Sequence, residues 1–299
     1  MIQIPNSKQI LVIGSTGQLG KTFSALAEQY TEYQWIFASR SELEISHGET
    51  FMESYLESLD RIPEIWINCA AFTAVDDAET KTDLAQLVNT HGPKVLAKSA
   101  QKHGAVLIHF STDYVYNGSS AFPISEDQDC HPLGAYGRSK LDGEVAIEEN
   151  CNAYYILRTS WLYSDYEPNF VRTMLRLATN RRSLSVVADQ FGSPTYAPYL
   201  ARTTMQLIQH WCEHSENPKY GIYHYSDEGC ISWNDFARTI FKMSHIDIEV
   251  SPITSEEFGA KAKRPAWSVL SKNKIKKTFG IQIPHWTVGL RQCLKKIST

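Results

Sequence analysis

The feature that most limits how this chain can fold is an alternation of short apolar runs with amphipathic segments through its first half. The apolar runs predict buried strands at residues 8–14, 34–39, 63–71, 105–111 and 152–160. Between some of them, apolar residues recur at helical spacing, as over 21–30 and 85–104. Strands that alternate with helices indicate a parallel sheet covered by helices on both faces. We therefore predict an α/β fold with a doubly wound parallel sheet, whose ligands bind beyond the carboxyl ends of the strands.

A glycine-rich turn follows the first predicted strand. In the stretch GSTGQLG, Gly14, Gly17 and Gly20 recur at every third position. Glycines at such a turn permit a tight bend, close approach of the backbone to a pyrophosphate, and close packing of the next helix, whose N-terminus attracts phosphates. The spacing has one residue more than G-x-G-x-x-G, and an ordinary glycine-rich turn is the alternative interpretation. The flanking strand and helix favour a Rossmann-type dinucleotide site.

The residues after the second strand bear on which dinucleotide binds. An acidic residue about 20 positions beyond the turn would bind the ribose 2′-hydroxyl of NAD. Ser39 and Arg40 stand there instead, and Glu42 and Glu44 come slightly later. A guanidinium matches phosphate geometry, so Arg40 suits the 2′-phosphate of NADPH, although a surface arginine that opens a loop is the alternative. We predict NADPH or NADH as the cofactor.

A candidate acid–base pair opens a later helix. In AYGRSK, Tyr136 and Lys140 are four residues apart and would share one helical face. Chance alone gives about one Tyr-x-x-x-Lys in a chain of this composition, so the context decides. Thr112 and Asp113 stand upstream, at the carboxyl end of the strand predicted at 105–111. We expect Tyr136 to protonate a carbonyl oxygen that Thr112 stabilises, while the ammonium of Lys140 lowers the pKa of Tyr136 and holds the nicotinamide ribose.

Composition argues against several other classes of protein. The net charge is −4 and the densest basic cluster, residues 272–277, is typical of a solvated helix face, so we expect no nucleic-acid partner. No apolar stretch reaches the ~20 residues of a membrane span, so we expect no membrane partner. The six cysteines are scattered without a C-x-x-C pair, which favours reduced thiols and a cytoplasmic protein. His210 and His214 lack the glutamate of a zinc-protease helix, and we expect no metal site.

Motifs along nearly the whole chain resemble a known family. GSTGQLG, NCAAFTAVDDAE, STDYVYNG and YGRSK, in this order, resemble the extended short-chain dehydrogenase/reductases. RTSWLYS, NFVRTMLRLA, VVADQFGSPTYA, GIYHYSDEG and RPAWSVLSKNKI are similar, more specifically, to the dTDP-4-dehydrorhamnose reductase family. The resemblance implies an NAD(P)H-dependent oxidoreductase of dTDP-rhamnose biosynthesis, which converts dTDP-4-dehydro-L-rhamnose (dTDP-4-dehydro-6-deoxy-L-mannose) to dTDP-L-rhamnose. Hydride would reach C4 of this nucleotide sugar, and Tyr136 would supply the proton.

The resemblance also implies roles for individual residues. Thr112, Tyr136 and Lys140 would form the catalytic set, and the deoxysugar would lie against Trp161 and contact Thr112 and Asp113. The cofactor-binding residues would be Gly14 and Thr16 in the turn, Gly17, Gln18 and Leu19 at the pyrophosphate, Ser39 and Arg40 at the adenosine ribose, Glu44 and Ile45 near the adenine, Ala71, Phe72 and Thr73 along the cofactor groove, and Tyr136 with Lys140 at its end.

A second, smaller α/β domain is expected to bind the substrate, because the second half mixes short strands with helices. The predicted ranges are 1–165 plus parts of about 188–226 for the dinucleotide-binding domain, and about 166–187 with 227–299 for the substrate-binding domain. Arg264 or Lys261 is expected to meet the substrate pyrophosphate. Some members of the family pair through magnesium held by glutamates near the C-terminus, where this chain has LKKIST. We expect a monomer or a homodimer.

Two other functions remain as alternatives. A sugar-nucleotide epimerase or dehydratase would share the cofactor motifs, but in dehydratases Asp-Glu follows the catalytic threonine, and this chain has Tyr114 in place of the glutamate. A non-catalytic subunit like the regulatory subunit of methionine adenosyltransferase would also keep the Tyr-x-x-x-Lys pair. Those subunits replace the Thr-Ser-Trp segment, whereas this chain retains Thr159, Ser160 and Trp161.

Overall fold

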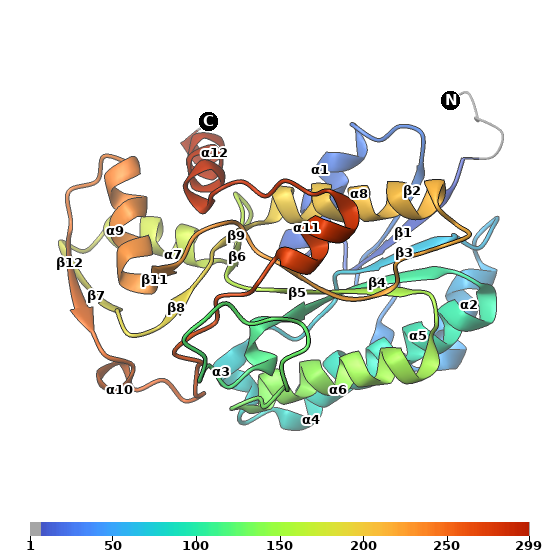
Figure 1. The fold of residues 1–299 in the computed structure, drawn as a ribbon, viewed down its shortest axis with the longest axis horizontal. Coiled ribbons are helices and arrows are strands. Elements are labelled where there is room, and N and C mark those ends of the chain that lie inside the picture. The colour runs from blue at the N-terminus through green and yellow to red at the C-terminus, as the bar shows by residue number, and fades with distance from the viewer. Residues whose placement is uncertain (1–6, 299) are drawn as a thin grey trace.

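The computed structural model describes residues 7–298, and a six-stranded parallel sheet lies at its centre (Figure 1). In spatial order the strands are β2 (Gln34–Ala38), β1 (Gln9–Ile13), β3 (Ile65–Asn68), β4 (Val106–Thr112), β5 (Tyr154–Thr159) and β10 (Gly221–Tyr225). Each neighbouring pair is parallel. The five strands predicted from apolar runs are confirmed, and β10 is a sixth strand that no prediction named.

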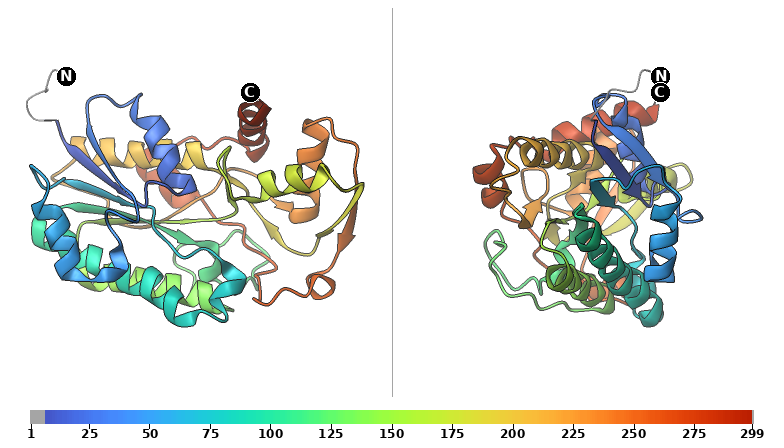
Figure 2. Two further views of the ribbon diagram at one scale, coloured as in Figure 1. Left: turned by 180° about the vertical axis from the view of Figure 1, so that it is seen from behind. Right: turned by 90° about the vertical axis from the view of Figure 1, so that its right-hand side faces the viewer.

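Helices cover both faces of the sheet, which confirms the doubly wound α/β fold (Figures 1 and 2). On one face lie α1 (Gln18–Ala27) and α8 (Ala197–Glu213), and on the other lie α2 (Glu49–Glu57), α5 (Gly92–His103) and α6 (Ala135–Asn150). Alternate side chains along each strand point to opposite faces of the sheet and pack in two separate hydrophobic cores. Ile10 and Val12 pack with Phe23 on the first face, and Leu11 and Ile13 belong to the core on the second. Because both faces are buried, the strands read as continuous apolar runs in the sequence.

The order of the strands sets the place of the site. After β1 the chain adds β2 on one side and then β3 on the other, so the winding reverses between β1 and β3. Ligands of doubly wound sheets bind at such a switch point, outside the carboxyl ends of the strands. Ile13 lies beside Asn68 in the register, and Cys69 N donates to Ile13 O. The glycine turn after β1 and the segment after β3 therefore lie side by side at the carboxyl edge of the sheet.

The helix predicted over 85–104 is divided into parts. α3 (Val75–Ala78) and α4 (Thr82–Gln86) precede a π-helical turn, η2 (Leu87–His91), from which α5 continues. A π-helical turn holds one residue more than an α-helical turn and is frequent at functional sites. The apolar spacing of the sequence does not reveal such an insertion, so it predicted one continuous helix.

A smaller region lies beyond the carboxyl ends of the central strands, at the left of Figure 1. It comprises α7 (Phe170–Ala178), β7 (Ser183–Val187), β8 (Phe191–Gly192), β11 (Ile231–Ser232), α9 (Trp233–Met243), β12 (Glu249–Ile253) and α10 (Ser255–Phe258). β12 pairs with β7, and β11 pairs with β8. Asn169 and Ser232 start α7 and α9 with side chains that accept from Arg172 N and Asp235 N. Local capping thus explains where both helices begin.

Shorter elements connect the two regions. β6 (Leu162–Tyr163) pairs with β9 (Thr195–Tyr196), α11 (Asn273–Phe279) packs against β10 and α8, and α12 (Trp286–Ser298) ends the described chain. The predicted domain ranges also include residues 1–6 and Thr299, which lie outside the described residues. Between residues 7 and 298, no helix has the length and apolarity that crossing a membrane requires. The same residues contain no group of three or more His, Cys, Asp or Glu that could hold a metal ion.

Candidate active site

The glycine turn after β1 brings backbone segments into close approach. Gly14 has φ +78°, and a Cβ there would lie 2.7 Å from Ala70 N, so a larger residue would separate the turn from the segment after β3. Gly20 faces the carbonyl oxygen of Gly14, which draws α1 against the turn. Gly17 is the N-cap of α1. The free N–H groups of this helix start point to an anion site, which fits a pyrophosphate.

A cavity of about 530 Å³ lies beside this turn. This cavity is lined by four residues that were predicted to bind the cofactor, Thr16, Ser39, Arg40 and Glu44. Ser41, His47 and Phe51 complete its lining. The side chain of Arg40 is 76% exposed and forms an ion pair with Glu44, whose pKa is lowered by hydrogen bonds from Ser46 and Arg40 in spite of partial burial. Ser39 Oγ donates to Glu42 Oε2 over 2.6 Å. A guanidinium and two carboxylates thus stand at the end of β2.

Three other predicted cofactor residues point their side chains away from the turn. Gln18 Oε1 accepts from Ser164 Oγ (3.1 Å) and Asn169 Nδ2 (2.8 Å), which ties α1 to the start of α7. Leu19 packs in the core, and Ile45 is buried in the space that Gly92 leaves. Gln18 and Leu19 can therefore serve an anion through the backbone N–H groups of the first helical turn.

Asn89 holds the segment after β3, where Ala71, Phe72 and Thr73 were predicted to line the cofactor groove. Asn89 lies in the π-helical turn, and its Oδ1 accepts from Phe72 N over 2.8 Å. Its Nδ2 donates to Phe72 O (3.0 Å) and to Ser139 Oγ (3.1 Å). The predicted groove is thereby fastened to α6. Sequence reasoning missed Asn89, because its role depends on the π-helical turn.

The structure brings the three predicted catalytic residues together at the carboxyl end of β4. Thr112 is the last residue of β4, and Tyr136 and Lys140 stand in the first two turns of α6. Gly137 abuts the carbonyl oxygen of Tyr114, so any side chain at that position would push α6 away from β4. The rings of Tyr136 and Tyr114 meet edge to face, 5.6 Å between centroids. The stretch AYGRSK thus opens a helix at the predicted site.

The electrostatics of the pair differ from the prediction. Burial raises the pKa of Tyr136 to about 12, against a smaller lowering by a hydrogen bond with Thr112. Lys140, which was expected to lower this pKa, instead directs Nζ at Phe110 O (2.7 Å) and His109 Nε2 (3.0 Å), and burial lowers its own pKa to about 8. The expected lowering is wrong, because desolvation dominates the pKa of Tyr136 and Lys140 is not among the groups that shift it. Tyr136 therefore keeps its proton at neutral pH, as a proton donor must.

Asp113 offers a buried acceptor next to Thr112. The residue is 2% exposed, and its Oδ1 accepts from Thr112 Oγ1 over 3.1 Å. Its Oδ2 is buried and makes no hydrogen bond with the described residues. Burial raises the pKa of this carboxyl to about 7. A buried polar atom without a partner is costly, and a ligand hydroxyl at this position would satisfy it.

Trp161 lies where β5 leaves the sheet, and it leads toward a second cavity. It has φ +49°, and its ring stacks on Trp233 with 3.5 Å between centroids, while Gly192 leaves space for its edge. Trp233 and Arg264 are among the residues that line a cavity of about 820 Å³ in the smaller region. Arg264 also pairs with Asp76 over 2.7 Å. The other predicted cation, Lys261, is exposed and does not line this cavity.

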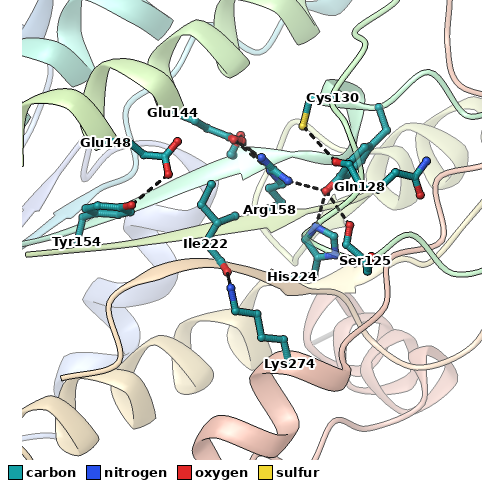
Figure 3. A network of polar contacts seen from close by, with 12 residues as sticks. Ser125, Gln128, Cys130, Glu144, Glu148, Tyr154, Arg158, Ile222, His224 and Lys274 are labelled. Atoms are coloured by element: carbon teal, nitrogen blue, oxygen red, sulfur yellow. Dashed lines mark hydrogen bonds and ion pairs between the residues drawn. The ribbon is translucent and has the colours of Figure 1, made fainter. Parts of the chain in front are cut away.

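A buried ionic network joins α6 to the central sheet (Figure 3). Arg158 of β5 donates to Glu144 of α6 through Nη2 (2.6 Å) and Nε (3.1 Å). Ser111 also donates to Glu144, and Arg158 Nη1 donates to the Tyr116 hydroxyl, which lies 2.8 Å from His224 Nε2. The network joins α6 to β4, β5 and β10. It fixes the helix that carries Tyr136 and Lys140.

Comparisons with known proteins find relatives along nearly the whole chain. The family model described as RmlD substrate binding domain matches residues 8–299. A dTDP-4-dehydrorhamnose reductase of Aggregatibacter actinomycetemcomitans is 39% identical over 95% of this chain and 97% of its own length. The crystal structure of a dTDP-4-dehydrorhamnose reductase from Clostridium acetobutylicum is similar with a TM-score of 0.91, at 37% identity over 97% of this chain and 100% of its own. That of Bacillus anthracis, in complex with NADP, has a TM-score of 0.89 at 38% identity over 97% and 99%.

Proposed function

The chain belongs to the RmlD substrate binding domain family, and on this premise we propose that it reduces dTDP-4-dehydro-L-rhamnose to dTDP-L-rhamnose with NADPH or NADH. It is an oxidoreductase, as are the reductases that match it over nearly its whole length. The observation that carries the assignment of residues is the meeting of Thr112, Tyr136 and Lys140 at the carboxyl end of β4. The alternatives of an epimerase, a dehydratase or a non-catalytic subunit have no observation of their own in their favour.

Tyr136 is the proposed proton donor. The bound nicotinamide supplies a hydride for C4 of the sugar, and the C4 oxygen then needs one proton. The raised pKa of Tyr136 keeps that proton on the phenol until a more basic oxygen arrives. Thr112, which donates to Asp113 in the free protein and lowers the pKa of Tyr136 against burial, is the proposed second donor to the same oxygen.

The turn and its cavity fit the proposed dinucleotide. Gly14 and Gly20 let the segment after β3 and α1 pack against the turn, and α1 presents its N-terminus to a pyrophosphate. Lys140 is the proposed partner of the nicotinamide ribose. At the other end, exposed Arg40 can leave Glu44 for a 2′-phosphate, whereas Glu42 and Glu44 suit ribose hydroxyl groups. We propose that NADPH is accepted for this reason.

The sugar and its nucleotide are proposed to extend from Thr112 into the smaller region. Asp113 Oδ2 would accept from a sugar hydroxyl, and Trp161 would pack against the sugar ring. Arg264 at the larger cavity would meet the pyrophosphate, since its guanidinium suits phosphate oxygens. The two regions would then divide as the predicted domains do, with residues 1–165 and parts of 188–226 binding the dinucleotide. A cytoplasmic location and a monomeric or homodimeric state belong to the same proposal.

Turnover tests the proposed function. The purified protein is mixed with dTDP-4-dehydro-6-deoxy-L-mannose and NADPH, and absorbance of the reduced cofactor is followed. We expect loss of absorbance with formation of dTDP-L-rhamnose. Binding of NADPH without any oxidation would reject the enzyme and favour a non-catalytic role. Oxidation of NADPH without dTDP-L-rhamnose would reject the proposed product.

A further inference from the structure

A buried hydrogen-bond chain runs from Asn68 through His109 to Lys140. Asn68 ends β3, His109 lies within β4, and each is 1% exposed, while Lys140 is 2% exposed. His109 Nδ1 lies 3.0 Å from Asn68 Nδ2, and His109 Nε2 lies 3.0 Å from Lys140 Nζ. No role of Asn68 or His109 was predicted from the sequence. An inference about them deepens the proposed function, because Lys140 serves the same site.

The backbone near Asn68 fixes the orientation of its amide. Ala70 N donates to Asn68 Oδ1 over 3.0 Å, so the other amide atom, Nδ2, faces His109 Nδ1. An amide NH₂ group can only donate, and Nδ1 must therefore accept. A neutral imidazole with an accepting Nδ1 carries its proton on Nε2. If the amide were turned over, its NH₂ group would face the N–H of Ala70, and two donors cannot satisfy one another.

The proton on His109 Nε2 decides which form of Lys140 fits. An ammonium has three donors and no acceptor, so it cannot receive the N–H of His109. An uncharged amine receives that N–H with its lone pair and still donates to Phe110 O, 2.7 Å away. The amine retains one further N–H for a ligand hydroxyl. The hydrogen-bond chain is thus complete only with an uncharged Lys140.

The surroundings of Lys140 favour loss of its proton as the pH rises toward 8. Glu144, one turn later on α6, is the anion that raises the pKa of Lys140, but Arg158 already binds its carboxylate (Figure 3). Ser111 donates to the same carboxylate. A protonated Lys140 would be a buried cation without an anion of its own, which is unfavourable. Burial lowers the pKa of Lys140 to about 8, and burial together with Lys140 holds the pKa of His109 well below its usual value.

We propose that His109 is a positioning residue for Lys140. Asn68 fixes its tautomer, and the Nε2–H of His109 donates to the uncharged amine and holds it against Phe110 O. The lysine can then gain or lose a proton near neutral pH, while its remaining N–H serves the ribose. The cofactor partner of the site would therefore be an amine whose charge depends on His109, and not a permanent ammonium.

Nuclear magnetic resonance of the wild-type protein, without cofactor or substrate, tests the proposal directly. The ¹⁵N shifts of His109 report which ring nitrogen carries the proton, and the shifts of Lys140 Nζ and Cε report its titration. We expect a Lys140 pKa of about 8 and, above that pH, a protonated Nε2 and an unprotonated Nδ1. A proton on Nδ1 or an imidazolium above that pH, or a Lys140 that stays an ammonium well above it, would overturn the proposal. These measurements require no turnover, so they separate this inference from the proposed enzymatic function.

The variant His109→Gln tests the dependence on His109. Its amide oxygen can accept from an ammonium, so the pKa of Lys140 should rise by about 1 unit, a tenfold change in the protonation equilibrium. His103→Gln is the control, because His103 pairs with Glu53 on α2, away from Lys140. It should leave the titration unchanged. An unchanged or lowered Lys140 pKa in His109→Gln would contradict the proposal.

The pH dependence of activity adds a measurement that a purely structural defect would not change. In His109→Gln, the apparent pKa of kcat/KM should rise together with the pKa of Lys140, whereas a structural defect would lower kcat at every pH. If this variant does not fold, Asn68→Asp replaces it. Its carboxylate would accept from Nδ1 and shift the proton away from Nε2, so the pKa of Lys140 should again rise. Retention of the proton on Nε2 in that variant would refute the role of Asn68.

Discussion

Removal of the Arg158 guanidinium should destabilise the fold more than removal of any exposed arginine. Arg158 and Glu144 have side chains 5% and 1% exposed, and three N–H···O contacts of 2.6 to 3.1 Å join them. In Arg158→Met, Glu144 keeps its hydrogen bond from Ser111 but remains a buried carboxylate without a cation. Breaking one side of a buried pair costs about 3–5 kcal/mol. This is a large part of the roughly 5–15 kcal/mol by which native proteins are stable.

The matched control is Arg172→Met. Arg172 pairs with Glu167 over 2.9 Å, but the two side chains are 31% and 56% exposed. Exposed ion pairs contribute about 0–1 kcal/mol, so this variant should stay within about 1 kcal/mol of the wild type. Urea unfolding followed by both circular dichroism and tryptophan fluorescence measures the free energy of unfolding and checks that the two probes coincide.

A double variant separates the charge from the packing. In Glu144→Leu with Arg158→Met, no buried charge is left unpaired, and replacing both partners of a buried pair by apolar residues is often close to neutral. We expect the double variant to be more stable than Arg158→Met alone, which is a coupling that independent sites would not show. If Arg158→Met lost no more stability than Arg172→Met, the reasoning about this network would be refuted.

Four further predictions concern the proposed site. Tyr136→Phe should lower kcat by about 10²–10⁴-fold with unchanged cofactor affinity, and a near-normal kcat would exclude Tyr136 as the proton donor. Lys140→Ala should weaken both kcat and cofactor binding in a fluorescence titration, and unchanged binding would remove its ribose role. Arg40→Ala should raise KM for NADPH and leave KM for NADH unchanged, whereas equal effects would place Arg40 away from the 2′-phosphate. Burial raises the pKa of Asp113 from 3.8 to about 7, so the folded protein holds a proton that the unfolded chain releases in this window. As the pH rises from 3.8 to about 7, the free energy of unfolding of the wild type should therefore fall relative to that of Asp113→Asn, by up to about 4 kcal/mol. Urea midpoints of the two proteins that differ equally at all pH values would contradict this expectation.

Patterns within short segments predicted the sheet and the turn. β1, β3 and β4 are buried on both faces, so their apolar runs identify them without knowledge of the partners. The turn at Gly14 could be predicted because two backbone segments approach too closely there for any side chain, and only glycine has none. The pair of Tyr136 and Lys140 gained meaning from its place after a strand end. Each of these features depends on residues close together in the sequence.

Features that depend on distant partners could not be predicted. The role of Asn89 requires a π-helical turn and the proximity of Phe72 and Ser139, which are 17 and 50 residues away. His109 reads as one residue of an apolar strand, and its partner Lys140 lies 31 residues later. The pKa of Tyr136 was predicted in the wrong direction, because a sequence shows a nearby lysine but neither burial nor the atoms that already bind its Nζ.

These distant partners share one consequence, which is that α6 is anchored to the sheet at successive turns. Ser139 receives a hydrogen bond from Asn89, Lys140 is held by His109, and Glu144 is held by Arg158. Tyr136 stands one turn before the first of these anchors, at the start of the helix. Strands β4 and β5 and the π-helical turn therefore help to fix where the phenol points relative to β4. A catalytic group on a helix held in this way needs little reordering when the substrate arrives, which favours the proton transfer proposed for it.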